Sequence, residues 1–322
     1  MATLSYQLIK SILKNCNFSG DKHSLKKEKG ADFLKETHMI FSYQYKDNLI
    51  DFIKQFVTFM NEKYPKIKLA RDINIEHFNE FLETLAKTSS TETLKTYCSY
   101  ISKIERCVNK TWHIKKNWHT ELCAPTSEKT PDGKRLRDQT MLREHYEALV
   151  VWGKERNSKF YIAVDLSARF GLRVEGCASI RYSDIHLYDS EMLGFWQLGV
   201  ISVTEKGGRR RNVDVHSEEN RLFLENLLTM RDGKKPEELV VGLKKDSINR
   251  QVNRALQALN LKHLYPVSSI HAVRKMYSQE IWDKCRDNSM SKKDSIRYCN
   301  RVLGHSEERN VSLLKRYVAV MS

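Results

Sequence analysis

The 322-residue sequence lacks the features that mark membrane, secreted and zinc-binding proteins. It has no run of about 18 apolar residues, so we expect no membrane-spanning helix. Residues 1–30 are mixed polar and lack the apolar centre of a signal peptide, so we expect no secretory leader. The seven cysteines are scattered and none belongs to a Cys-x-x-Cys pair. We therefore expect free thiols in a reducing cytosol, without disulfides or zinc.

Internal repeats and low-complexity segments are also absent, which excludes a repeat array. The length of the chain suits two domains. The strongest linker signal lies at residues 124–134, which contain two prolines, a glycine and several small polar residues. We therefore predict a helical domain at residues 1–123 and a larger domain at residues 135–322.

What the sequence has in excess is positive charge, with 55 Lys and Arg against 40 Asp and Glu and a net charge of +15. The basic residues are spread along the chain, which favours a long contact surface for a polyanion, most often nucleic acid. A basic protein with a well-solvated surface is the alternative. Residues 112–119 combine two tryptophans with Lys115 and Lys116, which could grip nucleic acid. Buried tryptophans beside solvated lysines explain this stretch equally well.

Apolar spacing predicts a mainly helical chain with one small β-hairpin or sheet, an α+β fold. The β signal lies at residues 198–215, where a run of β-branched residues, a Gly-Gly turn and a returning run follow one another. Two short helices are possible within residues 1–40. Further helices are expected near residues 48–64, 75–87, 94–108 with an N-cap within 89–91, 138–154, 159–169, 218–230, 247–259, 270–287, 293–303 and 312–320.

The segment at residues 303–322 organises the chemistry of the chain. It contains a Leu-Gly-His triplet that ends at His305, and then Tyr317 flanked by basic residues. A tyrosine hydroxyl has an unperturbed pKa of about 10. It attacks a phosphodiester only where cations neutralise the phosphate and a proton acceptor is near. If Tyr317 is a nucleophile, the rest of the sequence must supply two arginines, an acid and a base.

Candidates for these groups follow one another along the chain. They are found in the motifs Gly171-Leu172-Arg173, Thr204-Glu205-Lys206-Gly207-Gly208, His271-Ala272-Val273-Arg274, Leu303-Gly304-His305 and the single residue Tyr317. In this order the motifs resemble the tyrosine recombinase family, also called the phage-integrase family, over residues 135–320. Each motif is weak alone, but the complete ordered set is specific. The N-terminal helices are similar to the core-binding domain of that family only in position and helicity.

The resemblance implies a role for each residue, and side-chain chemistry agrees. Arg173 and Arg274 would each make bidentate hydrogen bonds to the non-bridging oxygens of the scissile phosphate, because a guanidinium stays charged and binds two oxygens at once. His271 and His305 would bond the phosphate or handle the tyrosine proton, and Lys206 would protonate the leaving 5′ oxygen. The structural alternatives are surface ion pairs for the arginines, a helix cap for the first histidine, and ordinary turns for the others.

Two features depart from the pattern of the family. The position three residues after Arg173 usually holds an acid but is Gly176 here, so that Glu175 is the available substitute. The interval from His305 to Tyr317 is longer than usual by about one helical turn, which a loop between them would absorb. Few residues follow the tyrosine, which leaves little room for a long C-terminal helix exchanged between subunits. We therefore expect the contacts between protomers to come from other parts of the chain.

Two other tyrosines compete for the role of nucleophile. Tyr277 lies one helical turn beyond Arg274, and this spacing favours a packing role. Tyr298 lies in an otherwise ordinary helical segment. Neither of them follows a Gly-His pair within a short C-terminal segment, as Tyr317 does.

The predicted function is that of an integrase-like, site-specific DNA recombinase of a mobile genetic element, located in the cytoplasm on a nucleoid or plasmid. It would cut and rejoin double-stranded DNA through a covalent 3′-phosphotyrosyl intermediate, without a metal, ATP or another cofactor. The resemblance implies a homo-tetramer on DNA, with DNA-bending accessory proteins as candidate partners and backbone contacts from Arg209, Arg210 and Arg211. Two alternatives stay open: a nicking-joining enzyme like a relaxase or a type IB topoisomerase, and a DNA-binding relative without activity.

Overall fold

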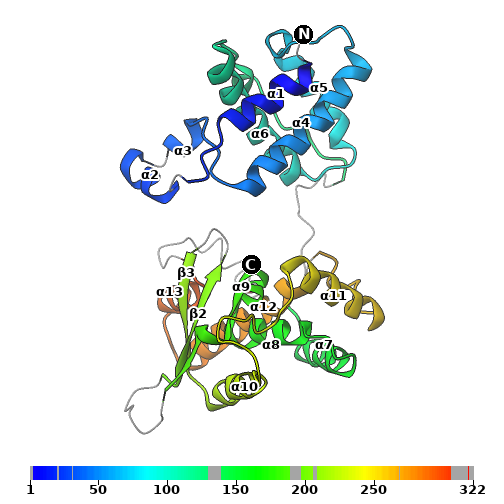
Figure 1. Cartoon of the computed structure of the whole chain (residues 1–322). Coiled ribbons are helices and arrows are strands. Elements are labelled where there is room, and N and C mark those ends of the chain that lie inside the picture. Colours follow the sequence, from blue (N-terminus) through cyan, green and yellow to red (C-terminus); the bar gives the residue numbers. More distant parts are fainter. Residues whose placement is uncertain are drawn as a thin grey trace. The chain divides into compact units, whose positions relative to one another are not determined.

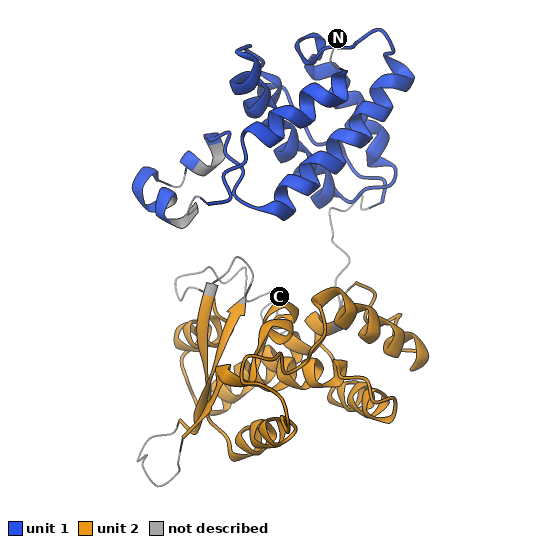
Figure 2. Cartoon of the chain, in the orientation of Figure 1, with its two compact units in different colours: residues 1–135 blue, residues 136–322 orange. Residues whose placement is uncertain are grey.

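The computed structural model describes residues 3–19, 22–30, 32–129, 139–188, 197–205, 209–267, 269–305 and 318. The chain divides into two compact units, Met1–Arg135 and Leu136–Ser322 (Figure 2), and each has its own hydrophobic core. Part of the predicted linker packs on unit 1. The buried Ser127 donates its hydroxyl to the carbonyl of Ser89 at 2.6 Å.

Unit 1 is helical (Figure 1), and its longer helices begin at side-chain caps. The hydroxyls of Ser42 and Ser90 accept hydrogen bonds from backbone amides in the first turns, and Asn74 forms a capping box with His77. The helices are α1 (Leu4–Lys14), α2 (Lys22–Lys29), α3 (Phe33–Glu36), α4 (Tyr43–Lys63), α5 (Ile75–Ala86) and α6 (Thr91–Trp112), with 3-10 turns η1 (Ala70–Asp72) and η2 (Trp118–Thr120).

Of the two tryptophans of residues 112–119, Trp118 belongs to the core of unit 1 and the half-buried Trp112 packs against it. Trp118 is 2% exposed, and its Nε1 donates to the carbonyl of Ile73 at 3.2 Å. The Nε1 of Trp112 donates to Oγ of Ser11 in α1 at 2.8 Å. Both indoles are therefore part of the fold, as in the buried-tryptophan interpretation of this stretch.

Unit 2 combines helices with one small antiparallel sheet in the order β1-β2-β3 (Figure 1). The register of β2 and β3 places Val203 opposite Arg211 and Thr204 opposite Arg210. The elements are α7 (Arg143–Glu155), α8 (Phe160–Phe170), α9 (Val174–Ser179), η3 (Tyr182–Asp184), β1 (Ile185–Leu187), β2 (Gly199–Glu205), β3 (Arg209–Val215), α10 (Glu218–Thr229), α11 (Lys245–Ala258), α12 (Ser269–Asp287) and α13 (Lys292–Val302).

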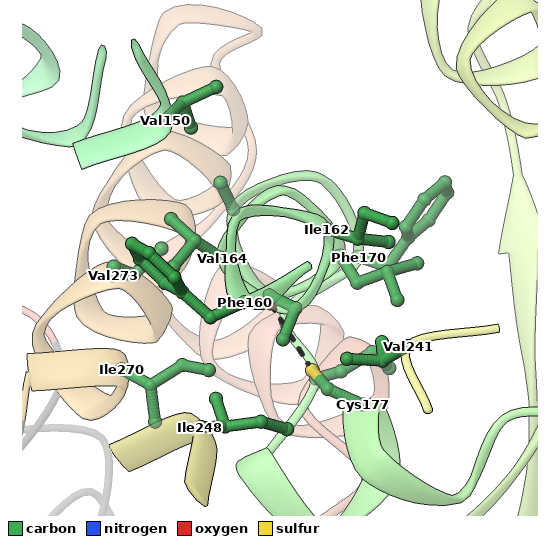
Figure 3. Close-up of a cluster of buried hydrophobic side chains, with 14 of the residues drawn as sticks. Val150, Phe160, Ile162, Val164, Phe170, Cys177, Val241, Ile248, Ile270 and Val273 are labelled. Carbon is green, nitrogen blue, oxygen red and sulfur yellow. Dashed lines mark hydrogen bonds between the residues drawn. The ribbon is translucent and has the colours of Figure 1, made fainter. Parts of the chain in front are cut away.

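The core of unit 2 surrounds α8, which is buried on almost every side (Figure 3). Phe160, Val164 and Phe170 contribute fully buried side chains, and Val273 of α12 packs into the same cluster. A helix that is apolar around most of its circumference requires neighbours on all faces, and α7, α9, α11 and α12 supply them. The rigid centre of the unit thus leads directly into the turn that carries Arg173.

The observed elements confirm the predicted class, a mainly helical chain with a small sheet. The three-residue strand β1 was not expected, because so short a run carries no alternation. The helix predicted to begin at residue 138 begins only at Arg143, because Leu142 before it has an extended backbone. The helix predicted at residues 312–320 lies outside the described residues, apart from Val318. No helix in the described ranges is long and apolar enough to cross a membrane.

Candidate active site

Arg173 lies in the turn that follows α8. Gly171 ends this helix at a φ of +59°, a left-handed conformation that favours glycine. The buried hydroxyl of Ser167 donates to the carbonyl of Leu172 at 3.0 Å and so fixes the turn. Arg173 is the N-cap residue of α9, and its side chain is half-buried. The turn therefore presents Arg173 from a fixed point at the edge of the core.

The ring of Tyr277 covers this turn. A Cβ atom added at Gly171 would overlap ring carbons Cδ1 and Cε1 of Tyr277, so a side chain does not fit there. Burial raises the pKa of the Tyr277 hydroxyl, and it also raises the pKa of Tyr298. A raised pKa makes the phenolate harder to form. The contacts of Tyr277 give it the packing role that its spacing favours.

Arg274 lies one helical turn before Tyr277 on α12 and is only 1% exposed. Its Nη1 donates to the carbonyl of Gly171, and its Nη2 donates to the carbonyl of Leu303 at 2.6 Å. The planar guanidinium suits this arrangement, because its donors point in fixed directions. Arg274 therefore joins the turn that carries Arg173 to the turn that carries the Gly-His pair.

His305 follows α13 in a Schellman turn. Gly304 has a φ of +69°, and its amide donates to the carbonyl of Arg301 at 2.9 Å. The amide of His305 donates to the carbonyl of Asn300 at 2.7 Å. This pair of bonds is the signature of the motif, and glycine is favoured at its left-handed position. The helix end thus holds the backbone of His305 in one place.

The imidazole of His305 reaches the first arginine. Its Nδ1 lies 3.4 Å from Nη2 of Arg173, and the side chain is 8% exposed. Because a guanidinium can only donate, Nδ1 is the acceptor in this contact. Arg173, Arg274 and His305, which are far apart in the sequence, are therefore gathered around two adjoining turns.

His271 is exposed in the first turn of α12, three residues before Arg274. Gly176 is buried within α9, and Glu175 lies in the first turn of the same helix. Gly176 has no side chain that could contact Arg173. Glu175 is the acidic residue nearest to Arg173 in the sequence.

Lys206 and Tyr317 lie outside the described residues. The strand β2 ends at Glu205 and β3 begins at Arg209, so Lys206 belongs to the connection between them. Val318, the residue after Tyr317, is 1% exposed. It packs in a cluster with Trp282, Cys299 and Leu303, which we call the C-terminal cluster. Because the carbonyl of Leu303 accepts from Arg274, this cluster adjoins the arginine site.

The predicted DNA contacts on β3 differ in their surroundings. Arg210 is exposed and pairs with Asp184 at 3.4 Å. Arg211 is half-buried, and its Nη1 donates to the carbonyl of Val302 at 3.0 Å. The side chain of Arg209 lies outside the described residues. Sequence reasoning missed the inward direction of Arg211, which its alternation with the apolar residues further along β3 could have indicated.

In unit 1, the two predicted contact lysines lie between α6 and η2. Lys115 is exposed and Lys116 is half-buried. Asn109 holds the backbone of Lys116 through two hydrogen bonds of 2.8 Å, one to its amide and one to its carbonyl. The structure therefore fixes the course of this loop and leaves the Lys115 side chain in solvent.

Comparison with known proteins gives structural matches only. No protein-family model matches the sequence, and no curated protein is similar to it in sequence. Lambda integrase (residues 75–356) bound to DNA matches at a TM-score of 0.63 and 14% identity, covering 95% of this chain and 93% of that chain. XerH recombinase in a post-cleavage complex with a palindromic difH substrate matches at 0.62 and 15%, covering 98% and 90%.

A third match is the Tn1549 transposon integrase (residues 82–397) in complex with circular intermediate DNA. Its TM-score is 0.57 at 14% identity, and the match covers 99% of this chain and 95% of that chain. All three are tyrosine recombinases. At such low identity the similarity is one of fold, and it extends over nearly the whole length of both partners. The chain therefore has the fold of the tyrosine recombinases.

Proposed function

We propose that the chain is a site-specific DNA recombinase that cuts and rejoins DNA through Tyr317. The hydroxyl of Tyr317 gives its proton to His271 or His305, and its oxygen attacks the scissile phosphorus and forms a 3′-phosphotyrosyl bond. The bond to the 5′ oxygen breaks, and Lys206 gives this oxygen a proton. The 5′ hydroxyl of a partner strand then attacks the phosphotyrosine and releases the tyrosine. Because the covalent link retains the energy of the phosphodiester, the proposal requires no ATP. Because the two arginines supply the positive charge at the phosphate, it requires no metal.

The observation that carries this proposal is that the imidazole of His305 contacts Arg173 and that Arg274 bonds to both of the turns that carry these two residues. Two guanidinium groups can neutralise the extra negative charge of a pentacoordinate phosphate, and an imidazole can hydrogen-bond to it. Their fixed positions matter, because preorganised donors cost little reorganisation during the reaction. Val318, the residue after Tyr317, is buried in the C-terminal cluster, and Leu303 of this cluster accepts a hydrogen bond from Arg274. The burial of Val318 beside the arginine site supports the role proposed for Tyr317.

Charge and structural similarity support DNA as the substrate. The net charge of +15 suits a polyanion, and binding should weaken steeply with salt. A lambda integrase tetramer bound to a Holliday junction matches this chain at a TM-score of 0.63 and 13% identity. By analogy we propose a homo-tetramer on double-stranded DNA, associated with a nucleoid or plasmid in the cytoplasm.

A trapping experiment tests the covalent step. The protein is incubated with a pool of nicked suicide duplexes of randomised sequence, and adducts are isolated on a denaturing gel and sequenced. We expect a 3′-linked adduct that maps to Tyr317, persists in EDTA and disappears in Tyr317→Phe. Tyr298→Phe is the matched control and should keep the adduct. An adduct that survives in Tyr317→Phe, or that requires magnesium, contradicts the proposal.

A joining assay distinguishes recombination from related chemistry. Two labelled duplexes that carry the trapped sequence are mixed with the protein, and exchanged strands are scored. Recombinant products support the proposal. Relaxed or nicked circles without exchange indicate a relaxase-like or type IB topoisomerase-like enzyme. Binding without any adduct indicates a DNA-binding relative that has lost activity.

A further inference from the structure

The end of α13 uses two arginine side chains to complete its hydrogen bonding. The last four carbonyls of an α-helix have no partner within the helix. Here the carbonyls of Asn300 and Arg301 accept from backbone amides of the Schellman turn. The next two, those of Val302 and Leu303, accept from Arg211 and Arg274 respectively. A positive side chain at a helix C-terminus also interacts favourably with the helix dipole.

Arg211 reaches this position from β3. Its side chain is on the same face of the strand as the buried Val213 and Val215, whereas Arg210 is on the opposite face. A Cβ atom added at Gly304 would lie 2.6 Å from Nε and 2.7 Å from Cδ of Arg211. The Arg211 side chain therefore lies directly against the glycine of the turn, and an alanine at this position would require the Arg211 side chain to move.

We propose that Arg211 is a positioning residue for His305 and does not act as a DNA-backbone contact. Its guanidinium caps α13 and packs on Gly304, so it holds the turn that presents the imidazole to Arg173. It also ties this turn to the strand β3. The proposal rests on the proposed function and deepens it, because it states how one of the groups expected to handle protons during strand cleavage is held in place.

The test separates the rate of the bound complex from DNA affinity. Arg211→Ala and Arg211→Lys are compared with Arg156→Ala, which removes the same charge from the exposed end of α7. We expect Arg211→Ala to lower the single-turnover cleavage rate at saturating DNA by about tenfold to a hundredfold, the effect of losing one charged hydrogen bond. Its Kd, and the dependence of Kd on salt, should match those of Arg156→Ala. Arg211→Lys should keep the affinity and recover the rate only in part, because an ammonium cannot reproduce the planar contact.

A second variant removes no charge. Gly304→Ala displaces the Arg211 side chain and also puts a side chain at a left-handed position, so it should lower the rate at least as much as Arg211→Ala. The double variant should then be scarcely worse than Gly304→Ala. The proposal is overturned if Arg211→Ala keeps the wild-type cleavage rate at saturating DNA. It is also overturned if Arg211→Ala binds DNA more weakly than Arg156→Ala and reduces the slope of log affinity against log salt concentration by about one more than Arg156→Ala does.

A readout without catalysis keeps this inference distinct from the proposed function. The amide of His305 is hydrogen-bonded in the turn, and its exchange with solvent reports the stability of that turn. We expect faster exchange in Arg211→Ala and unchanged exchange in Arg156→Ala. If the wild-type protein forms no adduct but this difference appears, the proposed function fails and the positioning of the turn stands. Equal exchange in both variants overturns the positioning.

Discussion

Replacement of Arg274 by alanine should destabilise unit 2 as well as abolish cleavage. The side chain is almost completely buried, and it donates to the carbonyls of Gly171 and Leu303. Without it, both carbonyls lose a partner inside the protein. A buried acceptor that loses its hydrogen bond costs about 1–3 kcal/mol, so the two together cost about 2–6 kcal/mol. Water that enters the space left by the side chain would move the value toward the lower end.

Arg173→Ala is the matched control, because it removes the other arginine of the site. Arg173 is half-buried, and its contact with His305 is long, at 3.4 Å. We expect its loss to change the free energy of unfolding by less than about 1 kcal/mol. Cleavage should still fall by orders of magnitude while most DNA affinity remains, as expected for a group that acts on the transition state.

The assay is urea unfolding of the full chain, with the unit 2 transition followed by hydrogen exchange of α12 amides. We expect Arg274→Ala to be less stable than Arg173→Ala by at least about 1 kcal/mol. Equal stability of the two variants would refute the bridging role of Arg274. If the expected difference appears, loss of cleavage in Arg274→Ala combines two causes, and Arg173→Ala is the cleaner probe of the chemistry.

Two further predictions concern other buried contacts of unit 2. Gly171→Ala should lower the unfolding midpoint through left-handed strain of about 1–2 kcal/mol and overlap with the Tyr277 ring, and a Tyr277→Ala background should relieve the overlap. An equal loss in both backgrounds would exclude the overlap as a cause. Burial raises the pKa of the Asp165 carboxyl, which accepts a hydrogen bond from the Tyr146 hydroxyl. The folded state therefore favours the protonated form of Asp165. The contribution of this carboxyl to the free energy of unfolding is full below about pH 3.9, the ordinary pKa of the unfolded chain, and is lost as the pH rises through the raised pKa. Thermal melts from pH 4 to 7 should show this loss in the wild type relative to Asp165→Asn, and parallel curves would contradict it.

Local sequence signals were sufficient for most elements of the fold. Apolar periodicity identified α4 and α5, because a helix buries one face and repeats it every 3.6 residues. The N-cap expected within residues 89–91 marked the start of α6, where Ser90 is the cap, and the Gly-Gly turn marked the β2–β3 hairpin. These signals depend on neighbours within a few residues, so they can be recognised without knowledge of the packing.

The order of the motifs also anticipated a site whose members lie far apart in the chain. It could not show how they are joined. Arg274 and Gly171 are 103 residues apart, and Arg211 and Val302 are 91 residues apart. A sequence pattern tells which face of an element is polar, but it does not tell which distant carbonyl that face will meet.

The sequence by itself determined the helices, the hairpin and the set of side chains suited to phosphate chemistry, because these follow from local periodicity and functional-group type. Only the tertiary structure decided which arginine is a bridge, which supports a helix end and which points to solvent. The reason is that a guanidinium has the same donors everywhere, and its role is set by the acceptors that folding brings within reach.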